Sequence, residues 1–171
     1  RNDTTQEGLS ILLRLLSLLP ERRMHILSTD SEFHSFTRQA RRLQEDRAAA
    51  IDWIAAEPFA DFAERFAAAA GRGGHDLIYV SQVFYNSGFA IADLARIVAA
   101  VGNPDTIIVI DGYHGFMALP TDLSALADRV FDLGGGYKCA MSGGGAVVLH
   151  APPGYGVRPR GTGWFAGFGA L

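Results

Sequence analysis

The sequence predicts an α/β fold of three layers, with a mainly parallel sheet between helices on both faces. Short apolar segments such as 77–83 and 106–110 alternate along the chain with segments of helical periodicity such as 59–70. Both apolar segments are hydrophobic at consecutive positions, which is typical of strands buried on both faces of a parallel sheet. The 171 residues suffice for one domain with a substantial core.

Four segments are expected to be helical: 9–19, 31–45, 59–70 and 91–101. The first has polar residues at helical spacing within an apolar run, and an Asp-Thr-Thr sequence before it offers N-cap groups. The second is polar and rich in arginine. The third combines phenylalanines at helical spacing with alanines, and the fourth ends at a Gly-Asn-Pro stop.

Six segments are expected to be strands: 25–28, 49–55, 77–83, 106–110, 129–133 and 146–149. Each is short and apolar, and most are closed by residues that favour turns, such as Glu57-Pro58, Asp111-Gly112 and the glycines at 134–136. In open parallel sheets, ligands bind outside the carboxyl ends of the strands. We therefore expect the functional residues in the segments that follow the strands.

Charge and composition exclude several classes of protein. Apolar residues make up 49% and charged residues 19%, which excludes a disordered or fibrous chain. The net charge is −3 without a basic stripe, so no nucleic-acid partner is expected. The single cysteine, Cys139, excludes a disulfide framework, and no zinc-binding motif predicts a metal. Without an apolar run of about 18 residues or a signal sequence, we expect a cytoplasmic protein with no membrane partner.

The chain contains one lysine, and its position is unusual. Lys138 stands in the sequence GGGYKCA at 134–140, followed by three more glycines at 143–145. A lysine amine that is desolvated becomes a nucleophile and forms a Schiff base with a carbonyl compound. The alternative is a lysine that neutralises a surface acid or a helix end. Its uniqueness and its glycine-rich setting favour the chemical role.

Asp111 and His114 follow the strand expected at 106–110. A carboxylate there either caps the next turn or binds a cationic ligand group, and opposite a pyridinium nitrogen it keeps that nitrogen protonated. Phe33, after the first strand, is either a core residue or a platform for a flat ring. Thr4 and Thr5 open the first helix, where an anion such as a phosphate can bind. No P-loop motif is present, and no dinucleotide-binding glycine motif follows the early strands.

Together these residues resemble the large domain of pyridoxal 5′-phosphate (PLP) enzymes of fold type I, in the class V aminotransferase superfamily, and within it the kynureninase-like proteins. Four motifs carry the resemblance: DTT at 3–5 resembles the phosphate-binding loop, DGYH at 111–114 the D-x-x-H motif, YK at 137–138 the Tyr-Lys pair, and TGWF at 162–165 a later G-W-[FW] motif.

The resemblance implies a role for each residue. Lys138 would hold PLP as a Schiff base and then move protons, Asp111 would bind the pyridinium nitrogen, and His114 would lie near the ring oxygen or the substrate carboxylate. The expected phosphate contacts are Tyr137, Thr4, Thr5 and, in the partner subunit of a homodimer with shared active sites, Trp164. Phe33 would stack on the ring. Tyr85 and Asn86 match a loop that faces the cofactor, without indicating which of them does so.

The resemblance also implies the reaction, with departures. Kynureninases carry an Asp three residues after the stacking Phe, where this chain has Phe36. The arginine that binds the substrate carboxylate normally lies in a C-terminal small domain, which is missing here. We therefore expect residues 1–171, which begin with Arg1, to be a PLP-binding large domain from a longer chain.

The expected reaction is kynureninase-like hydrolysis of an amino-acid substrate by cleavage of a C–C bond. The alternatives are a class V aminotransferase, a β-lyase or desulfurase-type tailoring enzyme, an inactive cofactor-binding fragment, and a Rossmann-like nucleotide binder. Cys139 directly follows the lysine, which makes it a poor persulfide carrier, because such a carrier normally needs a mobile loop.

Overall fold

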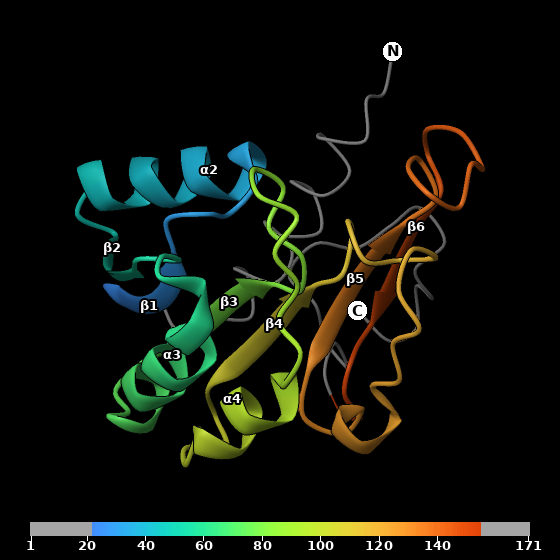
Figure 1. The fold of residues 1–171 in the computed structure, drawn as a ribbon. Helices are drawn as coiled ribbons and strands as arrows, with labels where there is room; N and C mark the ends of the chain where they lie inside the picture. The colour runs from blue at the N-terminus through green and yellow to red at the C-terminus, as the bar shows by residue number, and fades with distance from the viewer. Residues whose placement is uncertain (1–21, 155–171) are drawn as a thin grey trace, which may run out of the picture.

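The computed structural model describes residues 22–154, which form a six-stranded sheet with helices on both faces (Figure 1). The strands are β1 (Met24–Thr29), β2 (Ala49–Ile54), β3 (Leu77–Ser81), β4 (Ile107–Asp111), β5 (Phe131–Gly135) and β6 (Val147–His150). Their order in the sheet is β2-β1-β3-β4-β5-β6, and every neighbouring pair is parallel except β5 and β6. The predicted fold class is confirmed.

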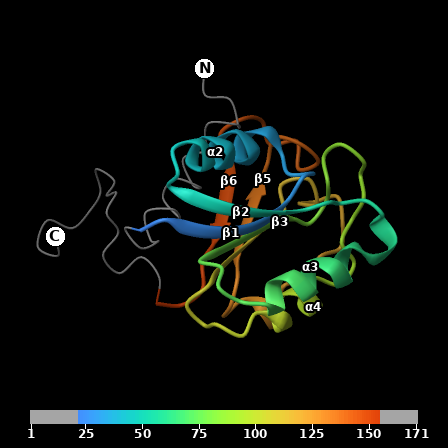
Figure 2. The ribbon, with the colours of Figure 1, turned by 90° about the vertical axis from the view of Figure 1, so that its left-hand side faces the viewer.

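Helix α2 (His34–Glu45) covers one face of the sheet, and α3 (Phe62–Gly71) and α4 (Leu94–Ala100) cover the other (Figure 2). Two 3₁₀ turns, η1 (Phe59–Asp61) and η2 (Ser124–Leu126), complete the helical elements among residues 22–154. None of these helices is long and apolar enough to cross a membrane. The helix expected at 9–19 lies outside the described residues.

Several elements differ in their bounds or helix type from what the sequence predicts. The helix expected at 91–101 begins at Leu94, because the Asp93 carboxylate accepts a hydrogen bond from the backbone N–H of Arg96 and caps the helix there. The helix expected at 59–70 begins with the η1 turn. The strand expected at 77–83 ends at Ser81, and the helix expected at 31–45 starts at His34.

The sheet separates two apolar cores. On the α2 face, Leu77 and Tyr79 of β3 pack with neighbouring strand residues and with α2. On the opposite face, the alternate β3 residues Ile78 and Val80 pack beneath α3 and α4. This alternation explains the continuous apolar pattern of the segment, since a strand buried on both faces needs apolar residues at every position. Phe66 of α3 is fully buried in the second core.

The connection from β4 to β5, residues 112–130, contains no α-helix. Near its end, Arg129 anchors it by donating hydrogen bonds to the carbonyl oxygens of Thr106 at 2.7 Å and Asn103 at 2.8 Å. Because β4 and β5 are parallel neighbours, this arrangement leaves their carboxyl ends side by side. The candidate site is built on these two ends.

Candidate active site at the carboxyl ends of β4 and β5

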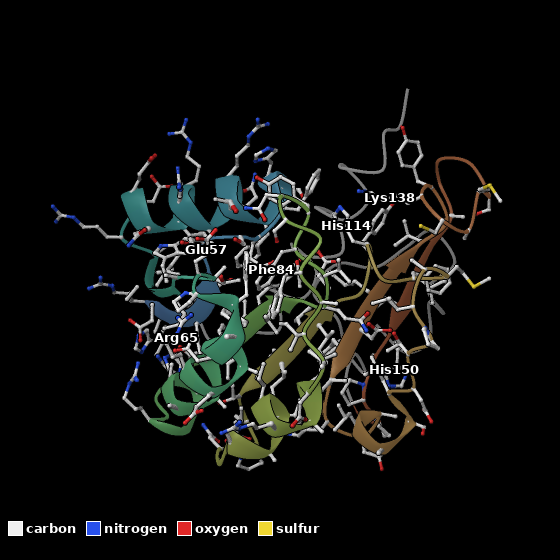
Figure 3. All side chains as sticks on the ribbon, in the orientation of Figure 1. Glu57, Arg65, Phe84, His114, Lys138 and His150 are labelled. Carbon is white, nitrogen blue, oxygen red and sulfur yellow. The ribbon has the colours of Figure 1, made fainter. Side chains whose placement is uncertain are left out.

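Lys138 lies in the turn after β5, and its side chain is half buried. Its Nζ contacts Nε2 of His114, which comes from the segment after β4 (Figure 3). The same amine lies 5.6 Å from the centroid of the Phe33 ring, within the range of a cation–π interaction. The structure thus brings together three residues that the sequence singled out in three separate segments.

His114 is held as a neutral imidazole. Burial lowers its pKa from the usual 6.5, the positive charge of Lys138 lowers it further, and the Asp111 carboxylate opposes both effects. At neutral pH the ring is therefore uncharged, and its Nε2 can accept a hydrogen bond from the Lys138 ammonium group. The ring centroids of His114 and Phe33 are 5.8 Å apart. Nε2 of His114 and Nζ of Lys138 are thus two neighbouring nitrogen atoms that can share one proton.

Asp111 is the last residue of β4, and two hydrogen bonds fix its carboxylate. Oδ2 accepts from the Tyr79 hydroxyl at 2.6 Å, and Oδ1 accepts from the backbone N–H of Tyr113 at 2.9 Å. Burial and then the carboxylates of Asp111 and Glu32 raise the pKa of Tyr79, so its hydroxyl stays protonated and donates. A carboxylate has about four lone-pair positions, so positions remain on Asp111 for a cationic ligand group.

Behind Asp111 lies Glu32, a buried carboxyl group that the sequence did not single out. Its Oε1 accepts from the backbone N–H of Ser81 at 2.9 Å, and its Oε2 lies 2.5 Å from the Ser81 hydroxyl. Burial raises the pKa of Glu32 from 4.5 to about 8; the Ser81 hydrogen bonds lower it and the Asp111 charge raises it further. Glu32 is therefore largely protonated at neutral pH, which limits the negative charge next to Asp111.

The glycine run before Lys138 is required by close packing. A Cβ on Gly135 would lie 2.1 Å from Cε2 of Tyr113, and one on Gly134 would lie 3.0 Å from Cδ2 of Phe116. Both aromatic residues belong to the segment that carries His114. The glycines thus allow this segment to lie against β5, which places His114 beside Lys138.

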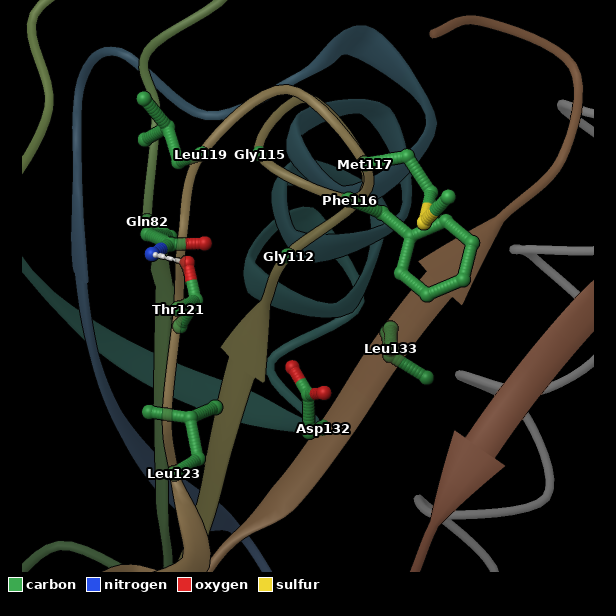
Figure 4. A pocket seen from close by; sticks show the side chains of 10 residues that line it. All are labelled: Gln82, Gly112, Gly115, Phe116, Met117, Leu119, Thr121, Leu123, Asp132 and Leu133. Atoms are coloured by element: carbon green, nitrogen blue, oxygen red, sulfur yellow. Dashed lines mark hydrogen bonds between the residues drawn. The ribbon is translucent and has the colours of Figure 1, made fainter. Parts of the chain in front are cut away.

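A pocket of about 290 Å³ adjoins this site (Figure 4). Its polar groups include Asp132 and Gln82, and the Gln82 amide donates a hydrogen bond to the Thr121 hydroxyl at 2.7 Å. Burial raises the pKa of Asp132, and the nearby Asp111 charge adds to this effect. The apolar lining comes largely from the 112–123 segment, and neither Lys138 nor His114 lines the pocket. It is a neighbouring cavity rather than the site itself.

The structure distinguishes Tyr85 from Asn86 in the loop after β3. The Tyr85 ring makes an edge contact with Phe33, with centroids 5.4 Å apart, and lies 6.4 Å from the ring of His114. The Asn86 amide instead donates to the Ser31 hydroxyl at 3.3 Å. Tyr85 therefore belongs to the aromatic cluster around Lys138.

One of the four predicted phosphate contacts, Tyr137, belongs to the described residues. Tyr137 is 58% exposed, beside the half-buried Lys138. Thr4, Thr5 and Trp164 lie outside the described residues. The phosphate-binding part of the site stays a prediction from the sequence.

The fold and the position of the site define the chain as an α/β domain with its functional residues at the carboxyl ends of parallel strands. No family model and no curated protein matches the sequence. Solved structures do match. An aminotransferase for ureidoglycine and glyoxylate from Bacillus subtilis superposes with a TM-score of 0.67 at 13% identity. A cysteine desulfurase from Thermococcus onnurineus gives a TM-score of 0.65 at 20% identity.

A third similar structure is histidinol-phosphate aminotransferase from Sinorhizobium meliloti in complex with PLP, with a TM-score of 0.63 at 18% identity. The matches cover 88%, 88% and 84% of this chain, in the same order, but only 38%, 37% and 40% of the similar proteins. The chain therefore shares the fold of part of these enzymes and spans about two fifths of their length.

Proposed function

We propose that this chain is the cofactor-binding part of a PLP-dependent enzyme that acts on an amino acid, with the cofactor bonded to Lys138 Nζ. The observation that carries the proposal is the position of the only lysine in the sequence. It contacts His114 and lies over Phe33, at the end of the strand next to the one that ends in Asp111. One of the similar structures is a complex with PLP, which supports the choice of cofactor.

The residues present fit this cofactor. The lone pairs left on Asp111 would hold the pyridinium nitrogen, and its hydrogen bonds to Tyr79 and Tyr113 fix the direction in which they point. Phe33 offers a ring face for stacking. When bound, PLP withdraws electrons from the α-carbon of an attached amino acid. His114 and Lys138 would hold and exchange the proton that leaves this carbon, and the contact between their nitrogen atoms supports this role.

The cofactor assignment can be tested cleanly because the chain has a single lysine. The purified chain is mixed with PLP, reduced with borohydride and mapped by peptide mass spectrometry. We expect a pyridoxyl group on Lys138, its loss in Lys138→Ala, and its retention in Cys139→Ala, which changes the exposed neighbouring residue. Absence of the group in a folded chain, or its attachment to the terminal amine alone, would refute the proposal.

For the reaction, we propose kynureninase-like hydrolytic cleavage of a C–C bond, on the basis of the D-x-x-H and Tyr-Lys motifs. The second candidate is an aminotransferase or lyase, which is favoured by the similar structures: an aminotransferase, a cysteine desulfurase and a cystine C–S lyase. Incubation of the protein and PLP with L-kynurenine and, in a separate reaction, with L-cysteine distinguishes the two candidate reactions. Release of 2-aminobenzoate and alanine supports the first, whereas sulfide from cysteine or amino transfer to an oxo acid supports the second.

We further propose that the complete protein is a cytoplasmic homodimer whose active sites are shared between subunits. Large apolar side chains are exposed close to the candidate site: Met117 is 71% exposed, Met141 87% and Val148 55%. A subunit interface would remove this surface from water. Light scattering of the purified protein tests the dimer, and a monomer at all concentrations, with and without PLP, would contradict it.

A further inference from the structure

Two imidazoles and one carboxylate meet at the edge of the sheet opposite to Lys138. His25 is the second residue of β1, Asp52 belongs to the neighbouring strand β2, and His75 lies just before β3. These strands begin at this edge, whereas Lys138 follows the carboxyl end of β5. The cluster is therefore separate from the candidate active site.

Both imidazoles approach the same carboxylate oxygen. Nε2 of His25 lies 3.2 Å from Oδ2 of Asp52, and Nε2 of His75 lies 3.1 Å from it. The potential ligand atoms of the three residues all lie within 4.8 Å of one another. In a tetrahedral site with metal bonds of about 2.0 Å, neighbouring ligand atoms lie about 3.3 Å apart. The two nitrogen–oxygen distances are close to this spacing.

The hydrogen bond of His25 determines which of its ring nitrogens faces Asp52. Its Nδ1 lies 3.2 Å from the carbonyl oxygen of Gly74, which can only accept, so Nδ1 carries the hydrogen. Nε2 is then the ring nitrogen that faces the oxygen of Asp52, and it is the atom that a metal ion beside this carboxylate would contact. Metal-bound histidines commonly donate their second N–H to a backbone carbonyl in this way.

His75 contributes a fixed ligand atom. Its side chain is 1% exposed, and its Nδ1 has no hydrogen-bond partner among residues 22–154. Its backbone is also held, because the Thr106 hydroxyl donates to its carbonyl oxygen at 2.7 Å. Within the described part of the chain, Asp52 is the hydrogen-bond partner found for this ring, so Nε2 is the atom directed into the cluster.

Asp76, the acidic residue that follows His75, already accepts hydrogen bonds from other groups. Asp76 accepts hydrogen bonds from the Arg22 guanidinium, at 2.5 Å for the closest pair of atoms, and from the backbone N–H of His25 at 2.8 Å. The carboxylate that remains for a cation is Asp52. The His25 and Asp52 side chains are 36% and 42% exposed, which leaves a path for an ion and for water.

We propose that His25, Asp52 and His75 form a binding site for a divalent transition-metal ion such as Zn²⁺, with water completing the coordination. Two imidazole nitrogens and one carboxylate oxygen are a donor set that Zn²⁺ accepts. A bound ion would link β1, β2 and the loop before β3 and so stabilise this edge of the sheet. The proposal is independent of the cofactor assigned to Lys138.

The test is titration of the purified chain with Zn²⁺ by calorimetry and with Co²⁺ by visible absorption, which intensifies in tetrahedral coordination. All proteins carry Cys139→Ala, because the exposed thiol also binds these ions. We expect binding of one ion per chain, with affinity reduced at least about tenfold by His25→Ala and by Asp52→Asn. His150→Ala, which changes an exposed histidine elsewhere, should bind as the parent does.

His25 and Asp52 are both partly exposed, so their substitution should leave the chain folded, and circular dichroism verifies this. Absence of saturable binding to the folded chain would overturn the site. Binding that Asp52→Asn leaves unchanged would overturn it too, because the ion would then be held without the Asp52 carboxylate. Because the pyridoxyl group at Lys138 is measured separately, failure of one proposal is distinguishable from failure of the other.

Discussion

Replacement of Glu32 by glutamine is expected to stabilise the protein at alkaline pH. Glu32 is 2% exposed, and its pKa is about 8 instead of 4.5. Between these two pH values the folded chain holds a proton that the unfolded chain has released. The free energy of unfolding therefore falls as the pH rises from about 4.5 to about 8, and this contribution is constant above and below that window.

The size of the effect follows from the displacement of the pKa. A change from 4.5 to about 8, at about 1.4 kcal/mol per pH unit, corresponds to about 5 kcal/mol. Glutamine has no ionisation to lose and keeps the geometry: its oxygen accepts from the Ser81 N–H, and its amide donates to the Ser81 hydroxyl. We expect Glu32→Gln to exceed the parent by about 2–5 kcal/mol near pH 9 and to differ by less than about 1 kcal/mol near pH 4.5.

Urea unfolding from about pH 4.5 to about pH 9 measures this difference, with Glu57→Gln as the control. Glu57 is exposed, so its variant should follow the parent at every pH. A free energy of unfolding that is independent of pH in the parent would refute the argument. So would a Glu32→Gln curve that runs parallel to the parent curve, because the proton would then belong to another group.

Three further substitutions test the packing and the site. Tyr79→Phe removes the donor to Asp111 but keeps the ring, and should cost about 1–3 kcal/mol in urea unfolding; an unchanged midpoint would contradict the hydrogen bond. Gly135→Ala should lower the melting temperature and the pyridoxyl yield because its Cβ meets Tyr113, whereas Gly102→Ala, with no atom within 4 Å, should change neither. Phe66→Ala should cost about 3–5 kcal/mol in urea unfolding, and a loss below about 1 kcal/mol would show that its cavity is refilled.

The order and layering of the elements could be predicted because strands buried on both faces give continuous apolar segments. The ends of the strands were less predictable, because a polar side chain can be buried in a strand when it forms a hydrogen bond. Thr29 belongs to β1 and is fully buried, although it is polar and follows the strand expected at 25–28. Ser28 is equally buried and donates to the carbonyl oxygen of Tyr79 at 2.8 Å. Hydropathy does not record such bonds.

The candidate site was predictable in part for a similar reason. Asp111, His114 and Lys138 follow parallel strands, whose carboxyl ends lie at one edge of the sheet, so their proximity follows from topology. Glu32 and Tyr79 were missed. A tyrosine in an apolar strand resembles a core residue, and a glutamate in a segment expected to be a polar helix resembles a solvated one. Only the tertiary structure shows that both are buried beside Asp111.

The strands before and after the β4–β5 connection differ in burial, so we expect them to differ in local stability. Strands β1, β3 and β4 have a neighbour on each side and apolar packing on both faces, so their amides should exchange hydrogen only when the whole domain opens. Strand β6 is largely exposed, and β5 joins it to the rest through a connection with no α-helix. Asp111 ends a strand of the slowly exchanging part, while Lys138 lies in the turn between β5 and β6. A ligand held by both residues would couple the two parts, and the exchange of β6 amides would slow when it binds.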